Sequence, residues 1–338
     1  MGSTPTFGTT VPLAKYHSLR SGTLLGYGAQ HLSYSFQLAN GTCAVYNFRD
    51  AKYIKIIMRI GLHVSIAGKI YESLERAKAL GCNSMQIFSR NPRTWQSAKL
   101  DSSDVARFRE LKRELDIDPV VVHIPYLINL ATPNIPLYRK SIDAYIDDIK
   151  RSDALDAEYF VTHLGSHVGT GEEDGIARFA DAINEIIEKA KPKTTILFEN
   201  TAGSGSMIGY RFEHIKTIID RLDDADNVGV CLDTAHTFEA GYDISTEAGF
   251  KSTMKKFDEL IGSERIKVIH FNDSLSPFGS RVDRHQHIGK GNIGLDGMKR
   301  IINYPKFKDV TFIMETPKNT DRDDKMNMAT ARKICKTK

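Results

Sequence analysis

A repeated alternation of short apolar runs and helical stretches constrains the fold of this chain more than any other feature. From Met58 onward there are eight such runs, and each is followed by a loop and an amphipathic stretch. The runs are residues 58–63, 84–88, 119–123, 159–163, 195–199, 228–233, 267–270 and 311–315. Continuous apolar runs of this length are typical of strands buried on both faces, as in parallel sheets.

The segments between the runs have the spacing of amphipathic helices. Phe108, Leu111 and Leu115 would share one helix face, and residues 142–149 and 179–190 repeat the pattern. Successive strand ends lie roughly 36 residues apart, which suits one strand–helix unit per repeat. The pattern predicts an α/β fold of the (β/α)8 or TIM barrel class, with the site at the C-terminal ends of the strands. An open doubly wound sheet is the alternative, but it usually has fewer strands and a Gly-rich phosphate turn.

The composition limits the class of protein. The chain has 338 residues, of which 41% are hydrophobic and 26% charged, and this is typical of globular proteins. No apolar run approaches the roughly 20 residues that span a bilayer, so we expect no membrane partner. The four cysteines are scattered and predict neither a disulfide framework nor a cysteine zinc site. They fit a reducing, intracellular compartment such as the cytoplasm.

Residues 1–57 differ from the rest of the chain. They contain five basic residues and one acidic residue, so they carry the whole net charge of +4 and the other 281 residues sum to zero. Bulk charge therefore gives no reason to expect DNA binding by the main body. We interpret residues 1–57 as an extension: a disordered tail, an organellar or nuclear targeting segment, or sequence ahead of a native start at Met58. Residues 58–338 would form the barrel.

Residue types that bind metals lie at the predicted strand ends. The C-terminal strand ends of a barrel meet at one face, where barrel enzymes place their chemistry. Seven of the eight runs end in such a residue: His63, His123, His163, Glu199, Asp233, His270 and Glu315. Histidine and carboxylate are ligands of zinc and similar divalent ions.

Two further pairs enlarge this set. Asp233 and His236 are three residues apart just after a strand, a spacing that suits ligands of neighbouring metals. Asp283 and His285 alternate, so in an extended segment their side chains point to the same side. At least nine candidate ligands are too many for one ion, and we therefore expect two or three metals.

Six longer motifs coincide with these strand ends and the loops after them. They are HIPYLINLA (123–131), HLGSH (163–167), FENTAGSGSMIG (198–209), VGVCLDTAH (228–236), HFNDS (270–274) and GSRVDRHQHIGKGNIG (279–294). Together they resemble the endonuclease IV family of apurinic/apyrimidinic (AP) endonucleases, over about residues 58–335. The resemblance implies a barrel hydrolase of base excision repair that cuts DNA on the 5′ side of abasic sites. It also implies trimming of 3′ ends.

The resemblance distributes the candidate ligands over three zinc ions, for which Mn²⁺ is the alternative. It implies His123 and His163 on the first ion, Glu199 bridging to the second, Asp233, His270 and Glu315 on the second, and His236, Asp283 and His285 on the third. We assign Glu199 and Glu315 the further role of holding the attacking water. Two or more metals can activate water and clamp a phosphodiester, and the loaded site would be locally positive. His63 is expected beside the ligands and not among them.

The resemblance also predicts how an abasic site would be recognised. Asn91 and Arg93 follow the second strand, and Tyr126 and Leu127 follow the third. In the family an Arg and a Tyr-Leu pair enter the minor groove and fill the stack left by the flipped nucleotide. Opening a duplex costs least where stacking is already lost. We therefore expect these four residues to contact double-stranded DNA containing abasic sites, with the protein acting as a monomer.

One position departs from the family pattern. Leu275 stands where the family commonly has Lys, so a contact to the DNA backbone would be missing. Two other functions stay open: a single-metal sugar isomerase or epimerase on a similar barrel, and a non-catalytic damage-binding protein with structural zinc. The nuclease is favoured by the residues assigned to a third metal and by the residues that would enter the minor groove, Arg93, Tyr126 and Leu127.

Overall fold

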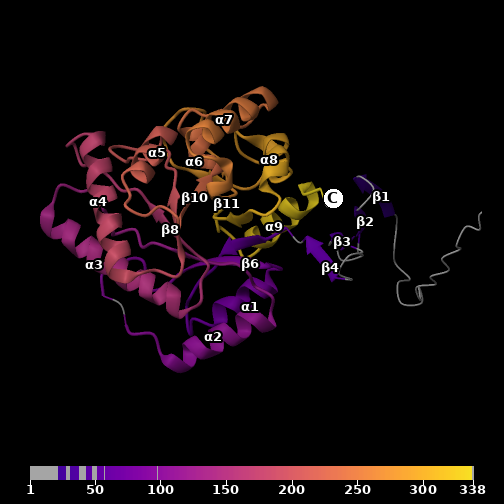
Figure 1. The fold of residues 1–338 in the computed structure, drawn as a ribbon, viewed down its shortest axis with the longest axis horizontal. Coiled ribbons are helices and arrows are strands. Elements are labelled where there is room, and N and C mark those ends of the chain that lie inside the picture. The colour runs from indigo at the N-terminus through magenta and orange to yellow at the C-terminus, as the bar shows by residue number, and fades with distance from the viewer. Residues whose placement is uncertain are drawn as a thin grey trace, which may run out of the picture. The chain divides into compact units, whose positions relative to one another are not determined.

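The predicted barrel is confirmed in a computed structural model, which describes residues 22–27, 31–37, 43–47, 52–56, 58–96 and 98–336 (Figure 1). Eight parallel strands close in the order β5–β6–β7–β8–β9–β10–β11–β14, and β14 pairs back with β5. They are β5 (Ile60–His63), β6 (Ser84–Phe88), β7 (Val120–His123), β8 (Tyr159–His163), β9 (Thr195–Glu199), β10 (Val228–Asp233), β11 (Ile266–His270) and β14 (Thr311–Met314). This closure excludes the open doubly wound sheet.

Helices surround the barrel (Figure 1). They are α1 (Glu72–Ala79), α2 (Ser102–Glu114), α3 (Ile135–Ala154), α4 (Glu172–Ala190), α5 (Phe212–Asp220), α6 (Thr234–Glu239), α7 (Glu247–Leu260), α8 (Gly294–Ile302) and α9 (Asp323–Ile334). The three amphipathic stretches predicted from the sequence lie in α2, α3 and α4. Short 3-10 turns, η1 (Ser263–Arg265) and η2 (Pro305–Phe307), precede β11 and β14. The small strands β12 (Asp273–Ser274) and β13 (His285–Gln286) pair antiparallel after β11.

The barrel unit spans Met58–Cys335. Ahead of it in the sequence, a separate antiparallel sheet has the order β1–β2–β3–β4. Its strands are β1 (Gly22–Tyr27), β2 (His31–Gln37), β3 (Cys43–Asn47) and β4 (Lys52–Ile56). The sequence of this segment lacks clear periodicity and provided no reason to expect them. Within the part of the chain that the structure describes, no helix is both long and apolar enough to cross a bilayer.

Two layers of inward-facing side chains occupy the barrel. The lower one, here called the apolar layer, consists of Val121, Val161, Leu197, Cys231, Val268 and Ile313, all fully buried. Residues two positions apart in a strand point to the same side. The next inward-facing position on each of these strands is therefore a residue at or just after the strand end. This second set, the ligand layer, consists of His123, His163, Glu199, Asp233, His270 and Glu315.

Candidate metal centre

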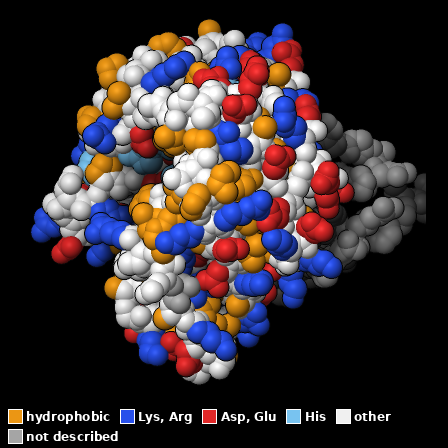
Figure 2. Space-filling view, turned by 90° about the vertical axis from the view of Figure 1, so that its left-hand side faces the viewer, with side chains coloured by type: hydrophobic (Ala, Val, Ile, Leu, Met, Phe, Trp, Pro, Cys, Tyr) orange, Lys and Arg blue, Asp and Glu red, His pale blue; other side chains and the backbone are white. Residues whose placement is uncertain are grey.

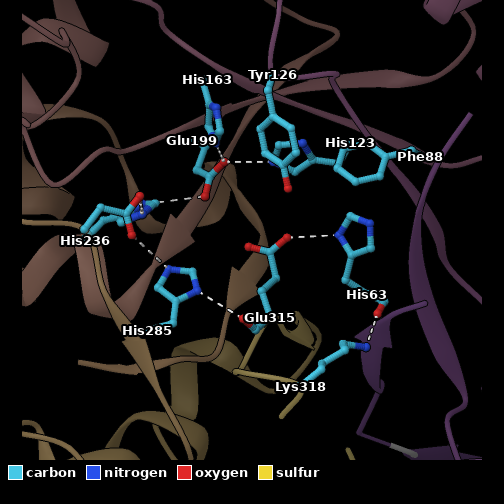
Figure 3. A pocket seen from close by; sticks show the side chains of 11 residues that line it. His63, Phe88, His123, Tyr126, His163, Glu199, His236, His285, Glu315 and Lys318 are labelled. Carbon is cyan, nitrogen blue, oxygen red and sulfur yellow. Dashed lines mark hydrogen bonds and ion pairs between the residues drawn. The ribbon is translucent and has the colours of Figure 1, made fainter. Parts of the chain in front are cut away.

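A cavity of about 340 Å³ opens at the C-terminal ends of the strands. Figure 2 shows histidine side chains within a hollow of the surface. The cavity is lined by His63, Phe88, His123, Tyr126, His163, Glu199, His236, Asp283, His285, Glu315 and Lys318 (Figure 3). Most of these residues come from strand ends or from the loops that follow them, as the barrel geometry requires.

Eight of the nine predicted ligands gather into three groups, within each of which the ligand atoms lie no more than 4.8 Å apart. The groups are His123, His163 and Glu199; Glu199, Asp233, His270 and Glu315; and Asp233, His236 and His285. Because Glu199 and Asp233 each belong to two groups, the three groups form one continuous centre.

The ninth predicted ligand, Asp283, lies at the edge of the third group. Its carboxylate oxygens are 3.2 Å from His236 Nε2 and 3.6 Å from His285 Nε2. Asp233 Oδ2 is also 3.6 Å from His285 Nε2. Two carboxylates therefore face this pair of histidines. From the sequence, Asp283 was expected on the third ion and Asp233 on the second.

Two buried nitrogen atoms test whether the residues fit a metal. Nε2 of His236 and Nε2 of His285 are buried, and neither has a partner with hydrogen-bond geometry among the described residues. Their Nδ1 atoms lie 2.9 Å from the Asn200 carbonyl oxygen and 3.2 Å from the Glu315 carbonyl oxygen. An imidazole that donates from Nδ1 presents a lone pair at Nε2, which is the form that binds a metal. The nitrogen and oxygen donors of this centre therefore fit divalent ions.

Glu199 lies at the middle of the centre and is fully buried. Its Oε2 is 3.3 Å from His123 Nε2 and 3.1 Å from His163 Nε2, and its Oε1 is 2.8 Å from His270 Nδ1. Burial by itself would raise the pKa of Glu199, but the His270 and His163 imidazoles hold it well below its ordinary value. Glu199 therefore stays ionised, and each of its oxygens faces a different part of the centre.

The carboxylates act on the imidazoles in the opposite sense. Burial lowers the pKa of His236, but Asp233 and Asp283 outweigh that effect and raise it well above 6.5. A site with this field favours any cation. Metal binding to such a site releases the protons that the imidazoles would otherwise hold.

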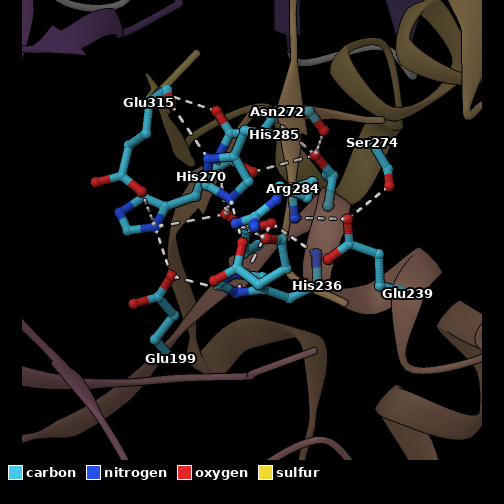
Figure 4. Close-up of polar contacts among 12 residues, drawn as sticks. Glu199, His236, Glu239, His270, Asn272, Ser274, Arg284, His285 and Glu315 are labelled. Atoms are coloured by element: carbon cyan, nitrogen blue, oxygen red, sulfur yellow. Dashed lines mark hydrogen bonds and ion pairs between the residues drawn. The ribbon is translucent and has the colours of Figure 1, made fainter. Parts of the chain in front are cut away.

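Two buried amide side chains orient the ligands, and the sequence did not predict either role. Asn272 Nδ2 donates to Asp233 Oδ2 at 2.7 Å, and its Oδ1 accepts the Glu315 backbone N–H at 2.8 Å (Figure 4). Gln86 Oε1 lies 2.8 Å from His270 Nε2, which donates to it. The available signals were a polar residue inside the apolar run SMQIF and an Asn two residues after a strand-end His. Such partners fix the ring orientation of metal ligands.

The remaining predicted residues lie beside the ligands, at the wall of the cavity or outside its lining. His63 Nδ1 is 3.1 Å from Glu315 Oε1, and burial lowers the pKa of His63. Tyr126 lines the cavity with 65% of its surface exposed, and Leu127 beside it is 36% exposed. Asn91 and Arg93 are exposed on the loop after β6, and neither is a lining residue of the described cavity.

The chain is similar to known proteins in both sequence and structure. The family model described as xylose isomerase-like TIM barrel matches residues 74–336. A probable endonuclease 4 of Halothermothrix orenii is 45% identical over 266 residues, which are 79% of this chain and 96% of that protein. The crystal structure of endonuclease IV from Thermus thermophilus is 35% identical with a TM-score of 0.74, and the match covers 82% of this chain and 98% of that one.

A more distant neighbour bears on the sugar-enzyme alternative. A D-tagatose 3-epimerase-like protein has a TM-score of 0.62 at 20% identity, over 82% of this chain and 97% of that one. At this identity the likeness shows the barrel fold alone.

Proposed function

The chain belongs to the endonuclease IV family, and from this premise we propose that it is a metal-dependent DNA hydrolase that cuts on the 5′ side of abasic sites. The products would be a 3′-hydroxyl and a 5′-deoxyribose phosphate. The same centre would trim blocking groups from 3′ ends, because those substrates present the same phosphodiester. Such an activity belongs to base excision repair inside the cell.

The continuity of the three ligand groups carries this proposal. A sugar isomerase with one metal needs only one such group. Here Glu199 and Asp233 join three groups, and each of the three has members that line one cavity. During hydrolysis of a phosphodiester, negative charge lies on the attacking oxygen, the phosphoryl oxygens and the leaving oxygen. Several cations can neutralise this charge.

We assign three divalent ions to these groups, zinc in the first instance and manganese as the substitute. His123, His163 and Glu199 would hold one; Glu199, Asp233, His270 and Glu315 the second; and His236, His285 and Asp283 the third, with Asp233 close by. When bound, such ions activate water and neutralise phosphate charge at neutral pH.

Glu199 and Glu315 are the carboxylates that would orient the attacking water. Burial by itself would raise the pKa of Glu315, but the neighbouring His270 and the hydrogen bond from His63 hold it well below its ordinary value. Both groups are therefore ionised and can accept hydrogen bonds from water. His63 keeps the Glu315 carboxylate in place from the side, at 3.1 Å.

Recognition of the lesion falls to the rim of the cavity. Tyr126 is mostly exposed while its ring packs edge-on against Phe88, with centroids 5.4 Å apart. An aromatic ring that is held against a neighbouring ring and is still largely exposed suits insertion into a base stack. We propose that Tyr126 and Leu127 fill the gap in the stack and that the Asn91–Arg93 loop contacts the same duplex. One barrel would bind the DNA as a monomer, and residues 1–57 would be an extension that catalysis does not need.

The test is cleavage of a duplex that carries one tetrahydrofuran abasic analogue, with and without prior removal of metal by a strong chelator. The analogue cannot undergo β-elimination, so a 5′-side cut that leaves a 3′-hydroxyl must be hydrolytic. We expect cleavage by the metal-loaded protein, loss after chelation and recovery with zinc. An intact duplex of the same sequence is the control.

The two alternatives give other results. A damage-binding protein would retain the abasic duplex in a binding assay but leave it uncut with metal present. A sugar epimerase would leave it uncut and unbound while interconverting a ketohexose. Either result would overturn the proposed nuclease function.

A further inference from the structure

Lys318 supplies a positive charge at the wall of the cavity. Within the described part of the chain it is the one Lys or Arg side chain among the lining residues. Its Nζ donates to the His63 carbonyl oxygen at 2.6 Å (Figure 3) and to Asp324 Oδ2 at 2.8 Å. The side chain is 43% exposed. An ammonium group has three donor hydrogens, so these two contacts leave one for a ligand.

The surroundings hold this ammonium group in place and neutralise its charge only in part. The His63 carbonyl is neutral, and in the pair with Asp324 the Lys318 side chain is 43% exposed and the Asp324 side chain 16% exposed, so water still reaches the ammonium group and screens the pair. Lys318 follows the ligand Glu315 by three residues, so one short segment carries both. Lysine binds phosphate as a compact point charge. An exposed lysine held at the edge of a polynuclear metal site therefore suits an anionic group that extends beyond the metals.

We propose that Lys318 binds a phosphate of the DNA strand next to the scissile phosphate. This inference rests on the proposed function, because it takes the ligand to be a polynucleotide. The scissile phosphate must lie against the ligand groups, whereas Lys318 contacts His63, and His63 in turn contacts Glu315. One residue thus separates the ammonium group from the ligands. Successive phosphates of a strand are about 3.4 Å apart along the duplex axis, so a neighbour can reach this position.

The salt dependence of binding tests the contact. The probe is a duplex with one tetrahydrofuran site whose 5′ linkage is a methylenephosphonate, which keeps its charge and resists hydrolysis. Each neutralised phosphate adds about 0.9 to the slope of log affinity against log salt. We expect Lys318→Met to lower the slope by about that amount. The ratio of wild-type to variant affinity should then shrink about 3.5-fold between 50 and 200 mM salt.

A matched control separates this contact from general charge. Lys306 on η2 also pairs with an aspartate, Asp258, at 2.8 Å, and it is 48% exposed. It lies just before β14, at the end of the barrel away from the cavity. Lys306→Met should leave the slope unchanged. Metal content should be the same in both variants, measured by plasma mass spectrometry.

A second variant separates ligand binding from a purely structural role, in which Lys318 would only link the cavity wall to α9. Asp324→Ala removes the side-chain acceptor of Lys318 and leaves the lysine in place. A phosphate contact predicts binding that is kept or strengthened, whereas a purely structural role predicts the same loss as Lys318→Met.

A neutral methylphosphonate placed at one linkage at a time identifies the phosphate. One position near the lesion should weaken binding by wild type and have no effect on Lys318→Met. The inference is overturned if wild type binds and cuts abasic DNA while Lys318→Met keeps the full slope. Failure of the proposed function looks different, because wild type itself would then leave the abasic duplex uncut with metal present.

Discussion

The apolar layer and the ligand layer occupy the same strands and differ completely in chemistry. They are two residues apart, which is about 7 Å along a strand. The lower layer consists of aliphatic side chains and one buried cysteine. In the upper layer four residues (His123, His163, Glu199 and Glu315) line a cavity, and the Glu199 and Glu315 carboxylates are ionised. The barrel therefore separates stability from chemistry by a single inward-facing position.

Leu197 and Glu199 on β9 are the clearest pair for this comparison. Both are fully buried, and Glu199 is the next inward-facing residue after Leu197. If the separation holds, removing one should damage stability and removing the other should damage catalysis. The predictions below begin with this pair and move outward.

The largest effect is expected from Glu199→Gln. The change removes a negative charge shared by two ligand groups, so we expect the single-turnover rate on the tetrahydrofuran duplex to fall about 10³-fold or more, or about 4 kcal/mol. Metal content should fall as well, while far-UV circular dichroism stays that of the wild type. A rate within tenfold of wild type would show that Glu199 is not at the reacting centre.

Leu197→Ala should do the reverse. Loss of a buried leucine in the apolar layer should lower the free energy of unfolding by about 2–5 kcal/mol, measured by urea titration. The rate per folded molecule should stay near the wild-type value, because the ligand layer keeps its donors. Leu197→Met, which conserves volume, is the control and should cost less than about 1.5 kcal/mol. Equal losses of rate and stability would mean that the two layers are not independent.

Glu239 tests how far the influence of the centre extends. It ends α6, the helix that carries His236. Its Oε1 accepts from Ser274 Oγ at 2.6 Å and from the Arg284 N–H at 3.2 Å, and its buried Oε2 finds no hydrogen-bond partner within the described structure (Figure 4). Burial raises the pKa of Glu239 to about 7. Folding therefore favours the protonated form of this carboxyl group.

The sign of the pH dependence follows. Below the unfolded-state pKa of about 4.3, Glu239 is neutral in both the folded and the unfolded protein and does not lower the free energy of unfolding. As the pH rises, the unfolded state ionises first and the free energy of unfolding falls, until above pH 7 the fall is complete. Glu239→Gln cannot ionise, so its advantage in unfolding free energy should grow between pH 5.5 and pH 8, on the order of 2–3 kcal/mol. Urea titrations in chelator at the two pH values measure it. Exposed Glu259 gives the control variant Glu259→Gln, and parallel curves for both variants would contradict the assignment.

The smallest effect is expected at the rim, at Leu275. Its side chain is 55% exposed on the loop between β12 and β13. Leu275→Lys should add one phosphate contact, raising the salt slope of abasic-duplex binding by about 0.9 and tightening binding a few-fold at low salt. Leu275→Met is the neutral control. An unchanged slope would place this side chain outside the path of the DNA.

Local patterns in the sequence determined the barrel and most of the candidate ligands. The repeat of a buried run and an amphipathic stretch is a local property, and so is the alternation of side chains along a strand. His123, His163, Glu199 and Asp233 each end a predicted strand, and the strand ends of a barrel meet at one face, so the sequence predicts them as one set.

Only the tertiary structure decided how these residues meet. Gln86 reaches His270 from the far side of the ring of strands, and Asn272 links Asp233 to the backbone of Glu315. The local pattern also did not show that Asp233 and Asp283 face one pair of histidines. Nor did it show the pairing of β12 with β13 or the separate sheet of β1–β4. Contacts across a closed barrel depend on strand tilt and stagger, which closure of the whole sheet sets. No short stretch of sequence carries that information.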